Sequence, residues 1–179
     1  YGDPLEREPK RVAADVRQGL VSREWAGRLY GAVLDAAGEV LVAETGALRA
    51  KTREQRMHSA SAPAGRSVHA GARLTAMGPE GRLGAILIAD GLYHCAACLV
   101  SICKIGEKLK DHLLLRRGPL GDAGPQSARR WGGESPTVEL WQYFCPNCGQ
   151  SSIIEQHLKS ENAVWEDRVV VRGTADQSA

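Results

Sequence analysis

Apolar positions near the start of the chain recur at helical spacing. Val12, Ala13 and Val16 form one apolar stripe among charged and polar neighbours. Pro9 suits the first turn of such a helix, and Gly19 suits its end. The pattern predicts a first short helix.

A second helical pattern follows directly. Ser22 can cap this helix, and Glu24 lies in its first turn. Trp25 and Leu29 lie four residues apart on one face, and Gly31 lies just past the last turn. These features predict a helix between Ser22 and Gly31.

The next segment changes its pattern twice. Two short apolar runs at 32–34 and 40–42 are separated by the turn-rich residues 35–39, which predicts a small hairpin. A charged helix is predicted from Thr45 toward Met57. These elements are short and have little apolar surface to bury among themselves.

Residues 58–82 are rich in Ser, Ala, Gly, Pro and Arg and lack hydrophobic periodicity, which predicts a linker. Beyond it, residues 83–89 predict a strand. A turn at Asp90-Gly91 separates this strand from residues 92–94, which lead into a CxxC sequence.

The second CxxC sequence has similar surroundings. Residues 108–117 lead away from the first pair, and residues 118–136 are a loop rich in helix and strand breakers. Residues 137–144 enter the second pair, and residues 151–158 leave it. A strand, a cysteine knuckle and a strand, occurring twice, is the layout of a zinc ribbon expanded by a long loop.

The predicted fold class is therefore α+β, with a small helical and hairpin N-terminal tail, a linker and an expanded, β-rich zinc-ribbon domain. The predicted boundaries are residues 1–57, 58–82 and 83–172, followed by a frayed tail at 173–179.

Composition adds a limit on the core. The chain has 179 residues, of which 43% are hydrophobic and 5% aromatic, and residues 31–92 contain no aromatic side chain. A chain with so little core material in its middle is expected to be a subunit or fragment that buries surface against partners. The net charge of +2 does not indicate a polyanionic partner.

Neither a membrane partner nor a secretory route is expected. No run approaches the 18 or more apolar residues of a membrane span, and the opening Tyr1-Gly2-Asp3-Pro4 is neither a signal peptide nor an initiator methionine. The chain is expected to begin inside a longer reading frame or after processing. Its cysteine usage suits a reducing compartment, so we expect a cytoplasmic protein.

Four of the five cysteines predict a structural zinc site. Two CxxC knuckles can each place two sulfurs about 2.3 Å from one tetrahedral Zn²⁺. Iron is the alternative ion. Cys103 is an alternative ligand that could replace Cys95, and otherwise it is a small buried hydrophobic residue. The predicted zinc ligands are Cys95, Cys98, Cys145 and Cys148.

The other polar residues do not form a catalytic or nucleic-acid-binding motif. We assign no role to His94 or His112, since a histidine beside a complete thiolate set is more often a hydrogen-bonded bystander. Residues 104–130 carry seven Lys or Arg against three Asp or Glu, but they contain no aromatic residue on which a nucleic-acid base could stack. Phosphate-binding loops, nucleophile elbows and HExxH sequences are absent from the sequence, so we expect no catalytic residue and no bound organic cofactor.

Two stretches resemble known families. The opening Tyr-Gly-Asp-Pro-Leu-Glu-Arg, together with residues 12–24 and 30–34, resembles the C-terminal end of hydantoinase B/oxoprolinase large subunits, and this resemblance covers residues 1–57. It implies a tail that wraps a large subunit. Residues 93–158 resemble the small zinc-binding subunit of acetone and acetophenone carboxylases, most specifically in the Tyr-Phe-Cys-Pro-Asn-Cys-Gly run at 143–149.

Both resemblances imply one type of complex. They imply a noncatalytic, zinc-binding subunit of a multi-subunit, ATP-dependent ketone carboxylase. Hydantoinase A-like and hydantoinase B-like large subunits would be its partners and would bind the ATP and a divalent metal. The first alternative is a subunit of a hydantoinase, oxoprolinase or lactamase-like ring-opening enzyme. The second alternative is a zinc-ribbon nucleic-acid-binding module, although we expect no nucleic-acid partner.

Overall fold

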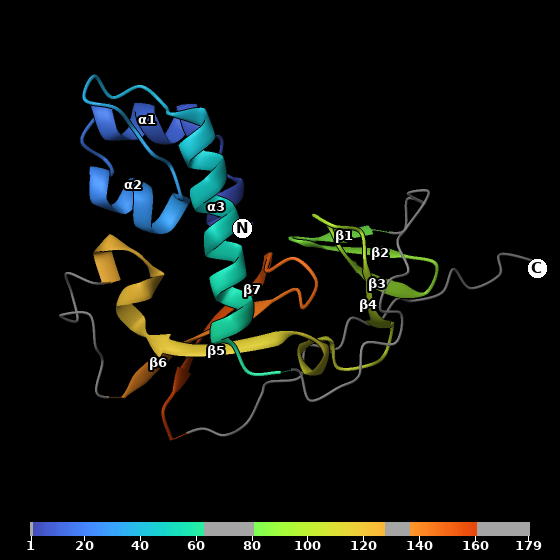
Figure 1. The fold of residues 1–179 in the computed structure, drawn as a ribbon. Helices are drawn as coiled ribbons and strands as arrows, with labels where there is room; N and C mark the ends of the chain where they lie inside the picture. The colour runs from blue at the N-terminus through green and yellow to red at the C-terminus, as the bar shows by residue number, and fades with distance from the viewer. Residues whose placement is uncertain (1, 63–80, 128–136, 161–179) are drawn as a thin grey trace, which may run out of the picture.

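The computed structural model describes residues 2–62, 81–127 and 137–160. N-terminal helices precede two antiparallel sheets (Figure 1), which confirms the predicted α+β class. Within these ranges, the helices are too short or too polar to cross a bilayer. The predicted tail at 173–179 lies outside the described residues.

Four helical elements form the N-terminal part. They are the 3-10 helix η1 (Pro4–Glu6) and the α-helices α1 (Pro9–Arg17), α2 (Arg23–Tyr30) and α3 (Val42–Ser59). The predicted caps of α2 are confirmed, because Ser22 Oγ accepts a hydrogen bond of 3.2 Å from Trp25 N and Gly31 adopts a left-handed φ of 60°.

The hairpin predicted at residues 32–42 is confirmed in a short form. Leu34 and Val40 form an antiparallel bridge, and hydrogen bonds of 2.9 Å from Asp35 N to Glu39 O and from Leu41 N to Val33 O lie on either side of it. The second arm is shorter than predicted, because α3 already begins at Val42. Helix α3 also holds the first arm, since Val33 N donates to Thr45 Oγ1 over 3.0 Å.

The first sheet has four strands in the order β1-β2-β3-β4. Their bounds are β1 (Gly81–Leu83), β2 (Ile86–Ala89), β3 (Leu92–Cys95) and β4 (Ser101–Lys104). The strand predicted at 83–89 is confirmed from Ile86 to Ala89, but its start is wrong, because the chain turns at Gly84, whose φ of 59° is available to glycine at little cost. The predicted turn at Asp90-Gly91 is confirmed.

The second sheet has three strands in the order β5-β6-β7. Its elements are η2 (Leu109–His112), β5 (Leu114–Pro119), η3 (Leu120–Ala123), β6 (Val138–Phe144) and β7 (Ser151–Leu158). The strands predicted on either side of the second CxxC sequence are therefore confirmed.

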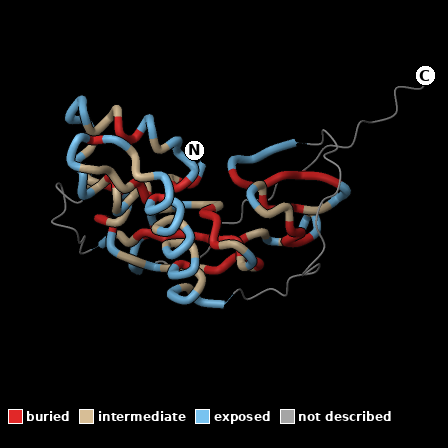
Figure 2. The backbone as a smooth tube through the Cα atoms, turned by 45° about the horizontal axis from the view of Figure 1, so that its top comes forward, coloured by how far each residue is buried: buried red, intermediate tan, exposed pale blue. Residues whose placement is uncertain are grey.

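The largest buried cluster contains side chains from both sheets. Ile86 and Ile102 come from the first sheet, and Trp141 and Tyr143 come from the second. All four side chains are buried, and Figure 2 shows the buried stretches of the chain in red. The two sheets therefore share one core, to which Cys95 and Cys145 belong, and Cys98 and Cys148 pack against it.

The boundary predicted at 58–82 stays a prediction, because residues 63–80 lie outside the described ranges. Helix α3 continues to Ser59, two residues beyond the predicted end of the N-terminal segment. Just after it, Ser61 and Leu115 exchange backbone hydrogen bonds of 2.8 and 3.2 Å. The end of the helical part is thereby attached to strand β5.

Candidate metal centre

Each CxxC sequence forms a tight turn between two antiparallel strands. The first knuckle, residues 95–100, connects β3 to β4, and the second knuckle, residues 145–150, connects β6 to β7. The two knuckles make equivalent backbone hydrogen bonds. Cys95 N donates to Val100 O over 3.0 Å, and Cys145 N donates to Gln150 O over 2.9 Å.

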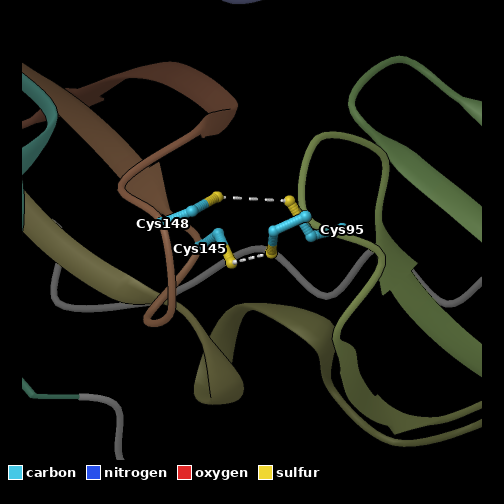
Figure 3. A group of neighbouring side chains, drawn as sticks. Cys95, Cys145 and Cys148 are labelled. Atoms are coloured by element: carbon cyan, nitrogen blue, oxygen red, sulfur yellow. Dashed lines mark hydrogen bonds between the residues drawn. The ribbon is translucent and has the colours of Figure 1, made fainter. Parts of the chain in front are cut away.

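The knuckles bring the four predicted ligands together (Figure 3). The Sγ atoms of Cys95 and Cys148 are 3.7 Å apart, and those of Cys98 and Cys145 are 3.8 Å apart. All four sulfurs lie within 4.8 Å of one another. Zinc–sulfur bonds of about 2.3 Å in a tetrahedron place the sulfurs about 3.8 Å apart. The group therefore has the donors and the size of a closed tetrahedral metal site.

The protonation of these thiols favours a cation at the centre. Hydrogen bonding with Cys145 and Cys148 lowers the pKa of Cys95, whereas hydrogen bonding with the same cluster raises the pKa of Cys145. Four thiolates at this spacing would repel one another, so the cluster by itself retains protons. A divalent cation would take the place of those protons, as soft thiolate sets bind zinc.

Cys103 lies outside the four-thiol group. It belongs to β4 and lies near Glu107 and His112. Burial, with the nearby Glu107 carboxylate, raises the pKa of the Cys103 thiol to about 12. The geometry thus favours Cys95 as the fourth thiol, although the ligand set itself stays a prediction.

His94 is enclosed by its own sheet. Its Nε2 lies 3.2 Å from Ala89 O, and its Nδ1 lies 3.3 Å from Ser101 Oγ. These contacts are those of a hydrogen-bonded core histidine.

The second knuckle is tied to the N-terminus by a buried ion pair that the sequence did not reveal. Arg56 of α3 donates two hydrogen bonds to the Asp3 carboxylate, of 2.7 and 3.0 Å, and a third of 3.2 Å to Gly149 O. Ser151 N donates to Asp3 Oδ2 over 2.9 Å. We call these four residues, Asp3, Arg56, Gly149 and Ser151, the N-terminal latch.

Helix α3 also approaches the second knuckle closely at Gly149. This glycine has a φ of 68°, and a side-chain carbon added to it would lie 2.5 Å from the carbonyl oxygen of Arg53. The close approach of the helix requires glycine here, and glycine also adopts the left-handed backbone at little cost.

The basic segment at 104–130 makes internal contacts in its described part. Lys110 Nζ lies 2.5 Å from a carboxylate oxygen of Glu155, and the Arg117 guanidinium lies 4.2 Å from the centre of the Trp141 ring. These cations stabilise the second sheet, which does not favour a phosphate-binding surface.

Comparison with known proteins gives two short matches. A segment of 61 residues, 32% of this chain, is 44% identical to the acetone carboxylase alpha subunit of Xanthobacter autotrophicus and covers 8% of that subunit. A segment of 50 residues, 28% of this chain, is 52% identical to the caprolactamase subunit beta of Pseudomonas jessenii and covers 9% of it.

These matches support the sequence resemblance in a coarse form. The chain spans less than a tenth of the length of the curated relatives it matches. No family model matches the chain. Part of the chain is therefore similar to a segment of a carboxylase subunit and to a segment of a caprolactamase subunit.

Proposed function

We propose that this chain is a noncatalytic, zinc-binding assembly subunit of a multi-subunit, ATP-dependent ketone carboxylase of the acetone or acetophenone carboxylase type. The observation that carries the proposal is the four-thiol group. It joins the edges of two sheets, and its second knuckle is attached to an N-terminal segment that resembles a large-subunit tail.

Cys95, Cys98, Cys145 and Cys148 would hold the zinc ion. Four thiolates fill a tetrahedral coordination shell and leave no position for a substrate, so the ion would supply stability rather than chemistry. The two knuckles would then act as a clasp that fixes the orientation of the two sheets.

The expected partners are hydantoinase A-like and hydantoinase B-like large subunits in a hetero-oligomer, which would bind the ATP and a divalent metal. Both relatives are subunits by name, which supports an assembly. Apolar side chains are also available for burial at an interface, since Leu20 is 68% exposed and Val42 is 78% exposed. We propose that the assembly is cytoplasmic.

A second candidate keeps the assembly and changes the reaction. The 52% identity to a segment of caprolactamase subunit beta supports a ring-opening enzyme as the complex that this chain joins. The zinc clasp would have the same role in either complex, because the reacting groups would belong to the large subunits.

The test is to co-express the chain with the large subunits encoded beside it and to purify the complex through a tag on this chain. We expect two large subunits to co-purify and zinc to be present at the clasp. Incorporation of labelled bicarbonate into a ketone, dependent on ATP, is the expected activity, whereas opening of a cyclic amide without bicarbonate would favour the second candidate.

Removing the metal tests the structural role. We expect a chelator that strips the zinc to release the large subunits, and re-addition of zinc to restore the complex. Full assembly and turnover after confirmed metal loss would contradict the proposal. Steeply salt-dependent binding of RNA or DNA by the chain, without co-purifying subunits, would instead favour the nucleic-acid-binding alternative.

A further inference from the structure

A second group of metal-ligating side chains lies in β4 and in the residues that follow it. It contains Cys103 in β4, Glu107 in the following turn and His112 at the end of η2. One donor atom from each residue lies within 4.8 Å of the other two. Glu107 Oε2 and His112 Nε2 are 3.3 Å apart.

The local backbone holds this group in place. The chain turns at Gly106, which has a φ of 95°, and Glu107 N donates to Lys104 O over 3.1 Å. Lys104 N donates in return to Glu107 Oε2 over 3.3 Å. The Glu107 carboxylate is thus fixed beside the end of β4 rather than extended into solvent.

The surroundings of the group favour a cation. Cys103 is fully buried within the core shared by the two sheets, and His112 is 9% exposed. A buried thiol beside a carboxylate cannot ionise easily without a compensating positive charge. A bound divalent cation would supply that charge to both groups.

We propose that Cys103, Glu107 and His112 form a second divalent-metal site, separate from the four-thiol group. A thiolate, an imidazole and a carboxylate are together the donors that zinc accepts, and three protein ligands leave one coordination position open. Binding forms a metal–sulfur bond and releases the Cys103 thiol proton to solvent. The Glu107 side chain is 39% exposed, so the group borders solvent on this side.

This site differs in kind from the four-thiol group. The four-thiol group has a complete set of protein ligands, whereas the second site would keep a position for water or for a small anionic or carbonyl ligand. The inference does not depend on the proposed function, since it concerns the metal content of the chain itself.

The experiment measures metal bound per chain. The purified full chain is loaded with Zn²⁺ or Co²⁺, freed of excess metal, and analysed by inductively coupled plasma mass spectrometry. We expect two metal ions per chain in the wild type and one in Cys103→Ser and His112→Gln. Glu107→Gln, which keeps the shape of the side chain, is expected to bind the second ion at least about tenfold more weakly, in line with the loss of a metal-orienting group.

A matched control is His58→Gln. His58 is an exposed histidine of α3 whose Nδ1 lies 2.8 Å from Glu54 O. This variant is expected to keep both ions. The absorption spectrum of the Co²⁺ form gives an independent measure, because Cys103→Ser should remove one sulfur-to-cobalt charge-transfer contribution and leave that of the four-thiol group unchanged.

One ion per chain in the wild type, with an unchanged Co²⁺ spectrum in Cys103→Ser, would overturn the proposal. If Cys103→Ser loses both ions because its core is disrupted, His112→Gln decides, since it leaves the buried thiol intact. Retention of two ions by His112→Gln would overturn the proposal, because the second ion would then bind without the His112 ligand.

Discussion

The two knuckles have the same backbone turn and different surroundings. In each, the residue after the second cysteine is left-handed and donates its N–H to the first cysteine's carbonyl, over 2.8 Å for Leu99 and 2.9 Å for Gly149. Leu99 packs against a small cluster within its own sheet. Gly149 instead lies against α3 and the N-terminal latch. The backbone turn is therefore compatible with either residue. The packing around the turn determines whether leucine or glycine occupies the position.

The two knuckles are also attached to the rest of the molecule in different ways. The first knuckle is joined to the rest of the molecule through its sheet and through the four thiols. The second knuckle has, in addition, the buried contact of Asp3 with Arg56. Loss of the metal should consequently affect the two knuckles unequally.

The largest effect is expected from removing a ligand of the metal. Cys98→Ser and Cys145→Ser, one from each knuckle, should both lose the ion of the four-thiol group, because a tetrahedral thiolate set binds poorly with one ligand missing. Structural zinc contributes about 10–16 kcal/mol in small zinc-finger peptides, so a large fall in the unfolding midpoint is expected. Metal analysis and urea unfolding followed by circular dichroism measure both effects.

Hydrogen exchange in the metal-free form tests whether loss of the metal affects the two knuckles unequally. The amide of Leu99 should lose protection to a greater extent than the amide of Gly149, because the latch still holds the second knuckle. Equal loss at both amides would mean that the latch gives the second knuckle no additional anchor.

The next largest effect concerns the latch itself. Asp3→Ala leaves the buried Arg56 guanidinium without its carboxylate partner, which typically costs about 3–5 kcal/mol. The measurement is urea unfolding of the metal-loaded chain. Glu8→Ala is the matched control, since Glu8 pairs with Arg11 at 57% and 76% side-chain exposure and should cost less than about 1 kcal/mol.

Metal content should stay unchanged in Asp3→Ala, because the carboxylate does not contact the thiols. A stability loss no larger than that of the control would show that the buried pair gives no net stabilisation. Loss of the metal would show that the latch positions the second knuckle for binding.

Gly149→Ala tests the close approach of α3. The strain of a left-handed alanine costs about 1–2 kcal/mol, and overpacking against the Arg53 carbonyl adds about 1–3 kcal/mol. Gly91→Ala is the matched control, because Gly91 has a φ of 70° and no atom within 4 Å of an added side-chain carbon. Gly91→Ala should therefore show the cost of a left-handed alanine without the cost of overpacking.

Unfolding in urea with metal bound measures the difference between the two variants. Equal destabilisation by both would mean that α3 does not press against the second knuckle in solution. A larger loss in Gly149→Ala would confirm that the helix fixes the identity of this glycine.

The local elements were predictable because their signals lie within a few residues. Ser22 and Gly31 mark the ends of α2 by capping chemistry, and the strands at 137–144 and 151–158 follow from their relation to the second CxxC sequence. The short hairpin around Leu34 and Val40 was predictable from its turn-rich centre, whereas the hydrogen bond from Val33 to Thr45 is a contact between elements that periodicity does not encode.

The contacts around the site were less accessible from the sequence. The four thiols were predicted as a group because CxxC spacing limits their geometry. Asp3 and Arg56 are 53 residues apart, and neither belongs to a motif that signals a partner. His112 was left without a role for the same reason, since its nearness to Cys103 depends on how η2 follows β4.

The smallest predicted effect concerns the first knuckle, where we expect the glycine variant of one residue to be more stable than the alanine variant. Leu99 is a half-buried residue with a φ of 60°, a conformation that costs a residue other than glycine about 1–2 kcal/mol. Leu99→Ala keeps this strain and loses the packing, whereas Leu99→Gly loses the same packing and is relieved of the strain. The alanine variant should therefore be the less stable by about 1 kcal/mol, opposite to the order at helical positions, where glycine is the worse residue. Urea unfolding of both metal-loaded variants measures this difference. A more stable alanine variant would mean that the first knuckle does not keep its left-handed residue in solution, and the correspondence between the two knuckles would then be limited to their cysteines.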